Sequence, residues 1–385
     1  MIPLSVPSLK GNELKYVTEC IETEWVSSAG PFVTRFERDV ARYLEIPSAV
    51  ACINGTAALH TALLLTGVGP EDEVVVPTLT FIAPVNAVRY VGAHPVFMDC
   101  DDWMNLDAEK LAEFLARECE PGDRGLVNRA SGRRVAAVLV VHVFGHPARL
   151  APLLGLARQF RLPLIEDATE ALGSTYEGWD GARRYAGTLG DVGCLSFNGN
   201  KLVTTGGGGM LLTRDAAVAE RARYLTTQAK DDGERFVHHE VGYNYRLTNV
   251  QAAIGCAQLE RVEEFIRIKR ENFAAYRRCL ADVPGLRLIE EPPGTRSNYW
   301  HYTLVVDEDR YGQSADTLRR RLAERAIETR PIWELNHRQR PYRDCHAYRI
   351  EKAVRYHARS VNLPCSVGLD PELVPEVARV IRERA

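Results

Sequence analysis

The chain has 385 residues; 45% are hydrophobic, 26% are charged, and its 48 Lys and Arg are nearly balanced by 51 Asp and Glu. The length is typical of two or three domains, or of one large domain with an appendage, and the composition excludes general disorder. The chain lacks the cationic excess of a nucleic-acid binder, so we expect no nucleic-acid partner. No apolar run approaches the roughly 20 residues of a membrane span, so we expect no membrane-spanning segment and no membrane partner.

Short apolar runs alternate with helical patterns from residue 49 to residue 213. Strands are predicted over residues 49–53, 72–77, 94–99, 135–141, 161–167, 191–197 and 207–213, and helices over residues 55–68 and 81–92. The nearly continuous β-branched run at 135–141 is typical of a strand covered on both faces. The alternation predicts an α/β fold with a mainly parallel sheet. The polar residues 118–134 predict an exposed loop.

The C-terminal part has a different pattern. Residues 247–283 form one long helical pattern that is interrupted only by Gly255, and a Pro- and Gly-rich cluster at 290–298 follows it. A strand is then predicted over 299–306, and helices over 315–327 and 371–384. The chain is therefore predicted to divide into a large α/β domain, residues 1–250, and a smaller C-terminal α+β domain, residues 251–385.

The N-terminus and the cysteines indicate the compartment. The first 17 residues have neither the basic nor the apolar region of a secretion signal, and the nine cysteines are scattered without a C-x-x-C pair. Such thiols are typical of core residues in a reducing cytoplasm, which is where we expect the protein. His142 and His146 are four apart, but Gly145 and Pro147 exclude a helical metal pair, and no metal site is predicted.

Candidate ligand-binding residues follow the predicted strands, because parallel α/β sheets bind ligands at the carboxyl ends of their strands. Thr56 and Ala57 open the helix after the first strand, where free amides can hold a phosphate; an ordinary helix cap is the alternative. Asp167 ends a buried strand, where a carboxylate needs a cation or caps the next helix. Lys201 follows another strand in a glycine-rich loop and is either a reactive amine or an ordinary solvated lysine.

Together these residues form a specific constellation. An anion site, a strand-end carboxylate and a loop lysine are what pyridoxal 5′-phosphate requires. The carboxylate keeps the pyridine nitrogen protonated, and the amine forms the imine. Asp167 and Lys201 are therefore the predicted catalytic residues.

Several segments resemble the DegT/DnrJ/EryC1/StrS sugar aminotransferases, which are fold type I pyridoxal-phosphate enzymes, and the resemblance covers nearly the whole chain. Within that family the chain looks closest to the legionaminic-acid-pathway aminotransferases. The segments that carry the resemblance are WVSSAGPFVTRFE, INGTAALHTAL, VPTLTFIAPVNAVRYVGAHPVFMDCD, VHVFGHPARL, LIEDATEALGS, GDVGCLSFNGNKLVTTGGGGML, GYNYRLTNVQAAIGCAQL and RPIW.

The resemblance implies roles for further residues. Phe81 would stack on the cofactor ring, and Ser196 would join Thr56 and the Ala57 amide at the phosphate. Asn244 would reach the phosphate from the neighbouring subunit, so that the site lies across a homodimer interface and an isolated chain is inactive. The nucleotide diphosphate has several candidate contacts, among which the sequence does not choose: Trp25, Ser27, Arg246, Arg330 and Trp333.

Glu170 departs from the commoner family pattern, in which Gln or His lies near the 3′-oxygen of the cofactor. An ionised carboxylate cannot donate a hydrogen bond to a phenolate and would repel it. Glu170 is therefore expected either to be protonated, to share a proton with that oxygen, or to turn away.

The resemblance implies a transaminase, because relatives with His at the position of Lys201 dehydrate their substrates instead. L-Glutamate would donate an amino group to C4 of a nucleotide-linked 4-keto-6-deoxy sugar for cell-surface polysaccharide synthesis. The first expectation for the acceptor is UDP-4-keto-6-deoxy-N-acetylhexosamine. The alternatives are GDP-4-keto-6-deoxymannose, as in perosamine synthesis, and a regulatory protein that binds pyridoxal phosphate without turnover.

Overall fold

A computed structural model describes residues 1–178 and 181–383, and its centre is an eight-stranded sheet. The strand order is β1-β11-β10-β7-β6-β2-β3-β16; only the pairs of β11 with β1 and β10 are antiparallel. The strands span β1 Ser48–Cys52, β2 Glu73–Pro77, β3 His94–Met98, β6 Val135–Val141, β7 Leu164–Asp167, β10 Val192–Ser196, β11 Gly209–Thr213 and β16 Ala347–Tyr348. The predicted mainly parallel α/β sheet is confirmed.

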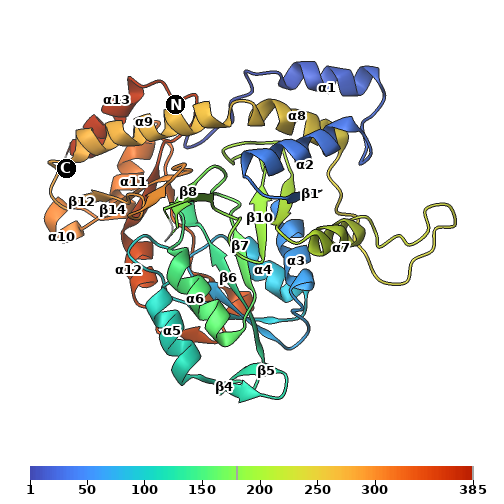
Figure 1. Ribbon diagram of the computed structural model, residues 1–385. Helices are drawn as coiled ribbons and strands as arrows, with labels where there is room; N and C mark the ends of the chain where they lie inside the picture. The colour runs from blue at the N-terminus through green and yellow to red at the C-terminus, as the bar shows by residue number, and fades with distance from the viewer. Residues whose placement is uncertain (179–180, 384–385) are drawn as a thin grey trace.

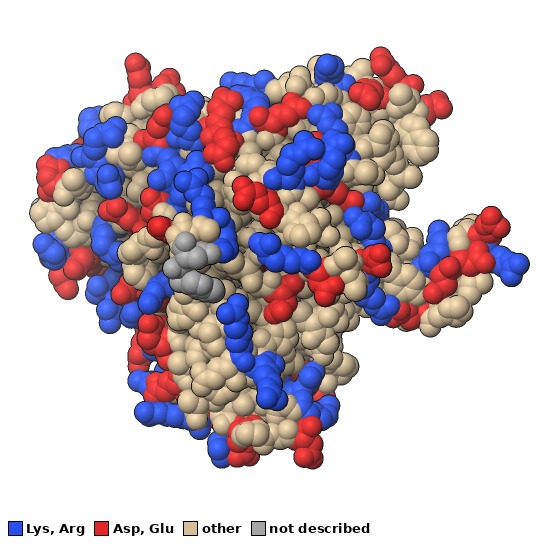
Figure 2. Space-filling model, in the orientation of Figure 1, with Lys and Arg blue, Asp and Glu red and all other residues tan. Residues whose placement is uncertain are grey.

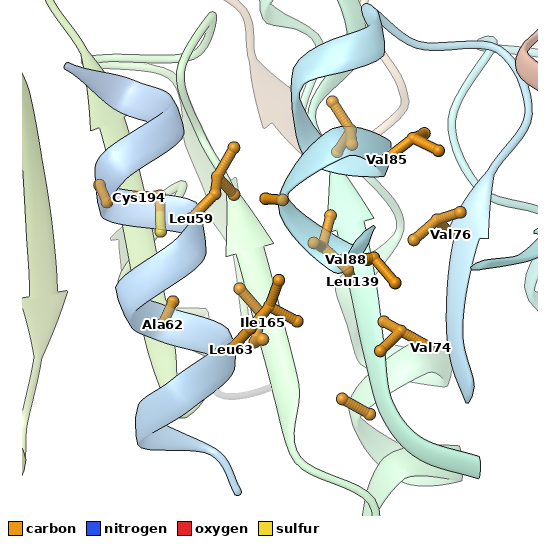
Figure 3. Close-up of a cluster of buried hydrophobic side chains, with 14 of the residues drawn as sticks. Leu59, Ala62, Leu63, Val74, Val76, Val85, Val88, Leu139, Ile165 and Cys194 are labelled. Carbon is orange, nitrogen blue, oxygen red and sulfur yellow. The ribbon is translucent and has the colours of Figure 1, made fainter. Parts of the chain in front are cut away.

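Helices cover both faces of this sheet, as the apolar strands require. Helices α3 Gly55–Leu65, α4 Ile82–Tyr90 and α7 Ala216–Thr226 lie on one face (Figure 1). Figure 3 shows side chains of α3 and α4 directed toward Leu139 and Ile165 of the central strands. The helices on the opposite face are α2 Pro31–Tyr43, α5 Ala108–Arg117, α6 Leu150–Phe160 and α8 Asn249–Leu259. This two-sided covering leaves the carboxyl ends of the strands for a ligand site.

The C-terminal part forms a second sheet with its own hydrophobic core. Its antiparallel order is β12-β14-β17-β15, and α9, α11 and α13 pack against it. These elements span α9 Val262–Leu280, β12 Leu286–Leu288, β14 Tyr302–Val306, α11 Ala315–Glu324, β15 Arg330–Pro331, β17 Ser360–Leu363 and α13 Leu373–Arg382. The α+β character expected for this part is confirmed. The boundary at residue 250 remains a prediction.

The remaining elements are short or peripheral. They are α1 Glu13–Glu22, β4 Cys119–Gly122, β5 Gly125–Asn128, β8 Thr175–Glu177, β9 Arg183–Tyr185, β13 Thr295–Arg296, α10 Glu308–Tyr311 and α12 Lys352–Arg359. The predicted loop at 118–134 thus contains the hairpin β4–β5. Within residues 1–178 and 181–383, no helix is both long and apolar enough to cross a bilayer.

The long helical pattern at 247–283 is two helices, and the break is not at the glycine. Helix α8 starts at a capping box between Thr248 and Gln251 and ends at Leu259, and α9 begins at Val262. Gly255 lies inside α8. A Cβ at this position would lie 2.6 Å from the ring of Phe36 on α2, so only glycine fits there. The glycine therefore allows α8 to approach α2 rather than ending a helix.

Candidate active site

A cavity of about 290 Å³ lies where β7 and β10 end and α3 begins. Most of the predicted site residues line it, and they come from segments far apart in the sequence. These lining residues are Thr56, Phe81, Asp167, Glu170, Ser196 and Lys201. Ala57 and Asn244 do not line it.

The anion-binding end of the cavity is the N-terminus of α3. Asn54 caps this helix: its Oδ1 accepts the Ala57 amide at 2.8 Å. The amides of Gly55 and Thr56 donate to none of the residues that the structure describes, so they are free to meet an anion. A Cβ at Gly55 would lie 2.8 Å from Cβ of Ser196, which places Ser196 directly beside this helix end. The Ala57 amide already has a partner, and its predicted contact with phosphate remains a prediction.

Asp167 is the last residue of β7 and is almost completely buried. Burial raises its pKa, although hydrogen bonds from Thr169 and the charge of Lys201 oppose the rise. Its Oδ1 accepts the Thr169 amide at 3.0 Å. A buried carboxylate with this environment gains strongly from a cationic partner, as a protonated pyridine nitrogen would be.

Glu170 lies in the cavity beside Lys201 and does not turn away from it. Its Oε1 is 3.4 Å from Lys201 Nζ, and its Oε2 accepts the Phe144 amide at 2.8 Å. Burial raises the pKa of Glu170 to about 7, against the opposing effects of Lys201 and the Phe144 amide. A protonated Glu170 is therefore accessible near neutral pH.

A buried pair supports the end of β7 from behind the cavity. Glu166, next to Asp167, accepts a hydrogen bond from His142 Nε2 at 2.9 Å and from the amides of Gly187, Leu189 and Gly190. His142 Nδ1 accepts the Ala148 amide, so Nε2 carries the hydrogen. The backbone amide of His142 donates to the Asp167 carbonyl at 3.0 Å. The pair therefore helps to hold Asp167 in place.

We expect Glu166→Gln to lower the free energy of unfolding by about 3 kcal/mol, because it leaves buried donors without their charged acceptor. Burial raises the pKa of Glu166. Hydrogen bonds from His142 and from the amides of Gly190 and Gly187 lower it by more, so the pKa lies below its usual value. The stabilisation is therefore complete above about pH 4.3 and is lost as the pH falls through the lowered pKa. Urea unfolding at pH 7 and at a series of pH values below 4 measures both effects.

The matched control is Glu271→Gln, which breaks an exposed ion pair with Arg267 on α9. It should change the free energy of unfolding by less than about 0.5 kcal/mol. Equal effects of the two substitutions would contradict the structural role of Glu166.

Sequence reasoning missed most of an aromatic wall. Trp300 and Trp333 both line the cavity. The ring centre of Trp333 lies 4.6 Å from that of Phe144, on which it stacks, and 6.3 Å from that of the predicted Phe81. The sequence predicts a strand over 299–306, but β14 begins at Tyr302, so Trp300 lies in the segment before it. Phe144 lies in a short connecting segment and has a positive φ of 57°. Trp333 is the one nucleotide candidate that lines this cavity among the residues that the structure describes.

The other nucleotide candidates lie elsewhere. Arg246 is bound to the buried carboxylate of Glu37, and Arg330 pairs with Glu328. The backbone carbonyls of Trp25 and Ser27 accept hydrogen bonds from Asn249. Their side chains remain candidates for a substrate contact.

Asn244 belongs to a projecting segment, the arm (residues 227–248), between α7 and α8 (Figure 1). Figure 2 shows the arm extending from the body with charges of both signs at its tip. Asn244 pairs with Thr227 at the base of the arm and does not reach the cavity of its own chain.

The residues fit pyridoxal phosphate. The free amides at the start of α3 suit its phosphate, Asp167 suits its ring nitrogen, and Lys201 Nζ lies in the same cavity. A mainly parallel α/β domain with this site defines a fold type I pyridoxal-phosphate-dependent enzyme.

Comparisons with known proteins agree. The family model described as the DegT/DnrJ/EryC1/StrS aminotransferase family matches residues 7–382. The chain is 39% identical to the GDP-perosamine synthase of Caulobacter vibrioides, covering 96% of this chain and 94% of that protein. It is 36% identical to the GDP-perosamine synthase of Escherichia coli O157:H7, covering 99% and 98%. The crystal structure of the aminotransferase TlmJ from Streptoalloteichus hindustanus superposes with a TM-score of 0.88 at 33% identity, covering 99% and 98%.

The chain belongs to the DegT/DnrJ/EryC1/StrS aminotransferase family. It is therefore a pyridoxal-phosphate-dependent enzyme that acts on nucleotide sugars, and the non-catalytic alternative is set aside. The narrower likeness to legionaminic-acid enzymes remains a prediction.

Proposed function

We propose that the protein transfers an amino group from L-glutamate to C4 of GDP-4-keto-6-deoxymannose, for the synthesis of a cell-surface polysaccharide. The supporting observation is that relatives aligned over nearly the whole chain, at 39% and 36% identity, are GDP-perosamine synthases. This favours the GDP-linked alternative over the UDP-linked N-acetylhexosamine that was first expected. Free cysteines at all nine positions support the expected cytoplasmic location.

The cavity residues divide the work. When bound, pyridoxal phosphate supplies the aldehyde that takes up the amino group and an electron-poor ring that stores an electron pair. Thr56 and Ser196 hold the phosphate at the start of α3, and Phe81 covers the ring. Asp167 keeps the proton on the ring nitrogen, and Lys201 Nζ moves the proton at the sugar C4.

The nucleotide is tested by turnover with ¹⁵N-glutamate and the GDP-linked and UDP-linked keto sugars, with the aminated product detected by mass. We expect kcat/KM for the GDP sugar to be higher by about 100-fold, because a site built for one base leaves buried polar groups unpaired with another. A preference for the UDP sugar would overturn the proposed substrate but not the aminotransferase class.

The arm supports a homodimer with shared active sites. Phe236 and Val241 of the arm have 71% and 78% of their surfaces exposed, which is costly for large apolar side chains unless a second copy covers them. If a partner packs against the arm, Asn244 at the base of the arm would lie at the interface, where it can reach the partner's cavity.

Subunit mixing tests this arrangement. Lys201→Ala and Asn244→Ala are each expected to lower activity, the second by at least about 10-fold through a lost phosphate contact. When the two variant proteins are mixed in equal amounts, about half of the dimers should be hybrids, and each hybrid has one intact composite site out of two. The mixture should therefore recover about a quarter of wild-type activity. No recovery would mean that Asn244 does not act across the interface.

A further inference from the structure

Lys201 Nζ lies between a carboxylate and an aromatic ring. It is 3.4 Å from Glu170 Oε1 and 4.0 Å from the centre of the Trp300 ring. The side chains of Lys201 and Glu170 are only 13% and 3% exposed, so little water screens these contacts. A carboxylate and an aromatic face are both groups that attract a cation.

Glu170 and Trp300 are held in place by shared hydrogen bonds. Asn298 donates through Nδ2 to the Glu170 carbonyl at 2.9 Å and accepts the Trp300 amide through Oδ1 at 2.9 Å. The Trp300 indole donates to the carbonyl of Asn200, the neighbour of Lys201, at 2.8 Å. One amide side chain therefore joins both residues that contact the amine.

We propose that Glu170 and Trp300 form a cradle for the free amine of Lys201, and that Glu170 accepts the proton that must leave this amine before it can act as a base. The step is a proton transfer from Lys201 Nζ to Glu170 Oε1. It converts an ammonium and a carboxylate into an amine and a carboxylic acid, and the reverse step restores them. The proposal rests on the reactive lysine of the proposed function and is independent of the nucleotide.

The surroundings of the pair disfavour the ionised form of Glu170. Burial disfavours charge and raises the pKa of Glu170 to about 7, and Asp167 adds to this rise. His301, beside Trp300, faces Lys201 but has a pKa well below its usual range, because burial and the charges of Lys269 and Lys201 disfavour its cation. His142 acts on Asp167 from behind β7. Glu170 is thus the group beside Lys201 that is suited to exchange a proton near neutral pH.

This arrangement also explains why a glutamate is present at position 170. One of its oxygens is bound by the Phe144 amide and the other by Lys201. A role toward the amine does not require Glu170 to donate a hydrogen bond to an oxygen of the cofactor. Glu170 acts as a positioning and proton-accepting residue for Lys201.

The first test uses the cofactor-free protein. Lysines are acetylated at pH 7.5 and at pH 11, and the rate at Lys201 is measured by peptide mass spectrometry. The rate at pH 7.5 is divided by the rate at pH 11, because this ratio removes differences in access to the amine. In Glu170→Gln the ratio should rise about 10-fold, because the ammonium loses its carboxylate. Trp300→Leu should raise it about 3-fold and Trp300→Phe less, since Phe retains an aromatic face.

Several controls keep the test decisive. Glu271→Gln on α9 should leave the Lys201 ratio unchanged, and Lys352 in each digest reports the reagent. Glu170→Asp, which keeps the charge, should lie between wild type and Glu170→Gln. Circular dichroism confirms folding; if Trp300→Leu does not fold, Trp300→Phe and Glu170→Asp still decide. A ratio in Glu170→Gln within 2-fold of wild type would overturn the proposal.

The second test is the pH dependence of the single-turnover reaction with glutamate, which requires no sugar. Wild type should show a rate that depends on a group titrating near pH 7, and Glu170→Gln should lose that dependence. An unchanged profile would contradict proton acceptance by Glu170. Failure of the GDP-sugar assay would leave both tests unaffected, so the two proposals can fail separately.

Discussion

Replacement of Lys201 by alanine is expected to lower amino transfer by about 10⁴-fold, because the reaction loses both its covalent anchor and its proton carrier. Lys201 Nζ is the amine within reach of Glu170 and Trp300 in the cavity. Release of amino sugar, measured by mass, gives the rate. Borohydride treatment of the wild-type holoenzyme should attach the cofactor at Lys201, as peptide mapping will show.

The control is Lys352→Ala, which removes an exposed lysine that pairs with Asp102. Its activity should stay within about 2-fold of wild type, because surface ion pairs contribute little. A reduced label at any position other than 201 would disprove the assignment.

Replacement of Asp167 by asparagine should lower kcat/KM by about 1,000-fold, or about 4 kcal/mol in transition-state stabilisation. An amide of the same shape keeps the packing at the end of β7 but no longer favours a proton on the facing ring nitrogen. Single-turnover absorbance with glutamate measures the loss directly.

Asp102→Asn, the other half of the remote ion pair, serves as the matched control and should retain activity. Asp167→Glu keeps the charge but lengthens the side chain, and partial activity would separate charge from position. Full activity of Asp167→Asn would remove the carboxylate from the mechanism.

The sequence predicted the large sheet because its strands are short, apolar and separated by helical patterns of ordinary length. Each strand expected between residues 49 and 213 is present within three residues at either end. It did not predict β16, a two-residue strand from the C-terminal part that joins the large sheet beside β3. A pairing between residues about 250 positions apart leaves no local pattern.

The candidate site shows the same division. Asp167 and Thr56 could be found because Asp167 ends a recognisable strand and Thr56 lies just after another, and parallel strands bring such residues to one edge. The contacts of Glu170 with Lys201 and the Phe144 amide could not be found, because they depend on how three separate loops pack. The same holds for Trp300: the sequence places it in a predicted strand over 299–306, whereas it lies before β14 and lines the cavity.

The amino-acid sequence alone therefore determined the class of fold and the cofactor, and it predicted the reactive lysine, since these depend on local periodicity and on residue types at strand ends. Only the tertiary structure decided which side chains surround that lysine. The electrostatic environment of a buried amine depends on burial and on distances of a few ångströms between segments remote in the chain, and neither property is encoded locally.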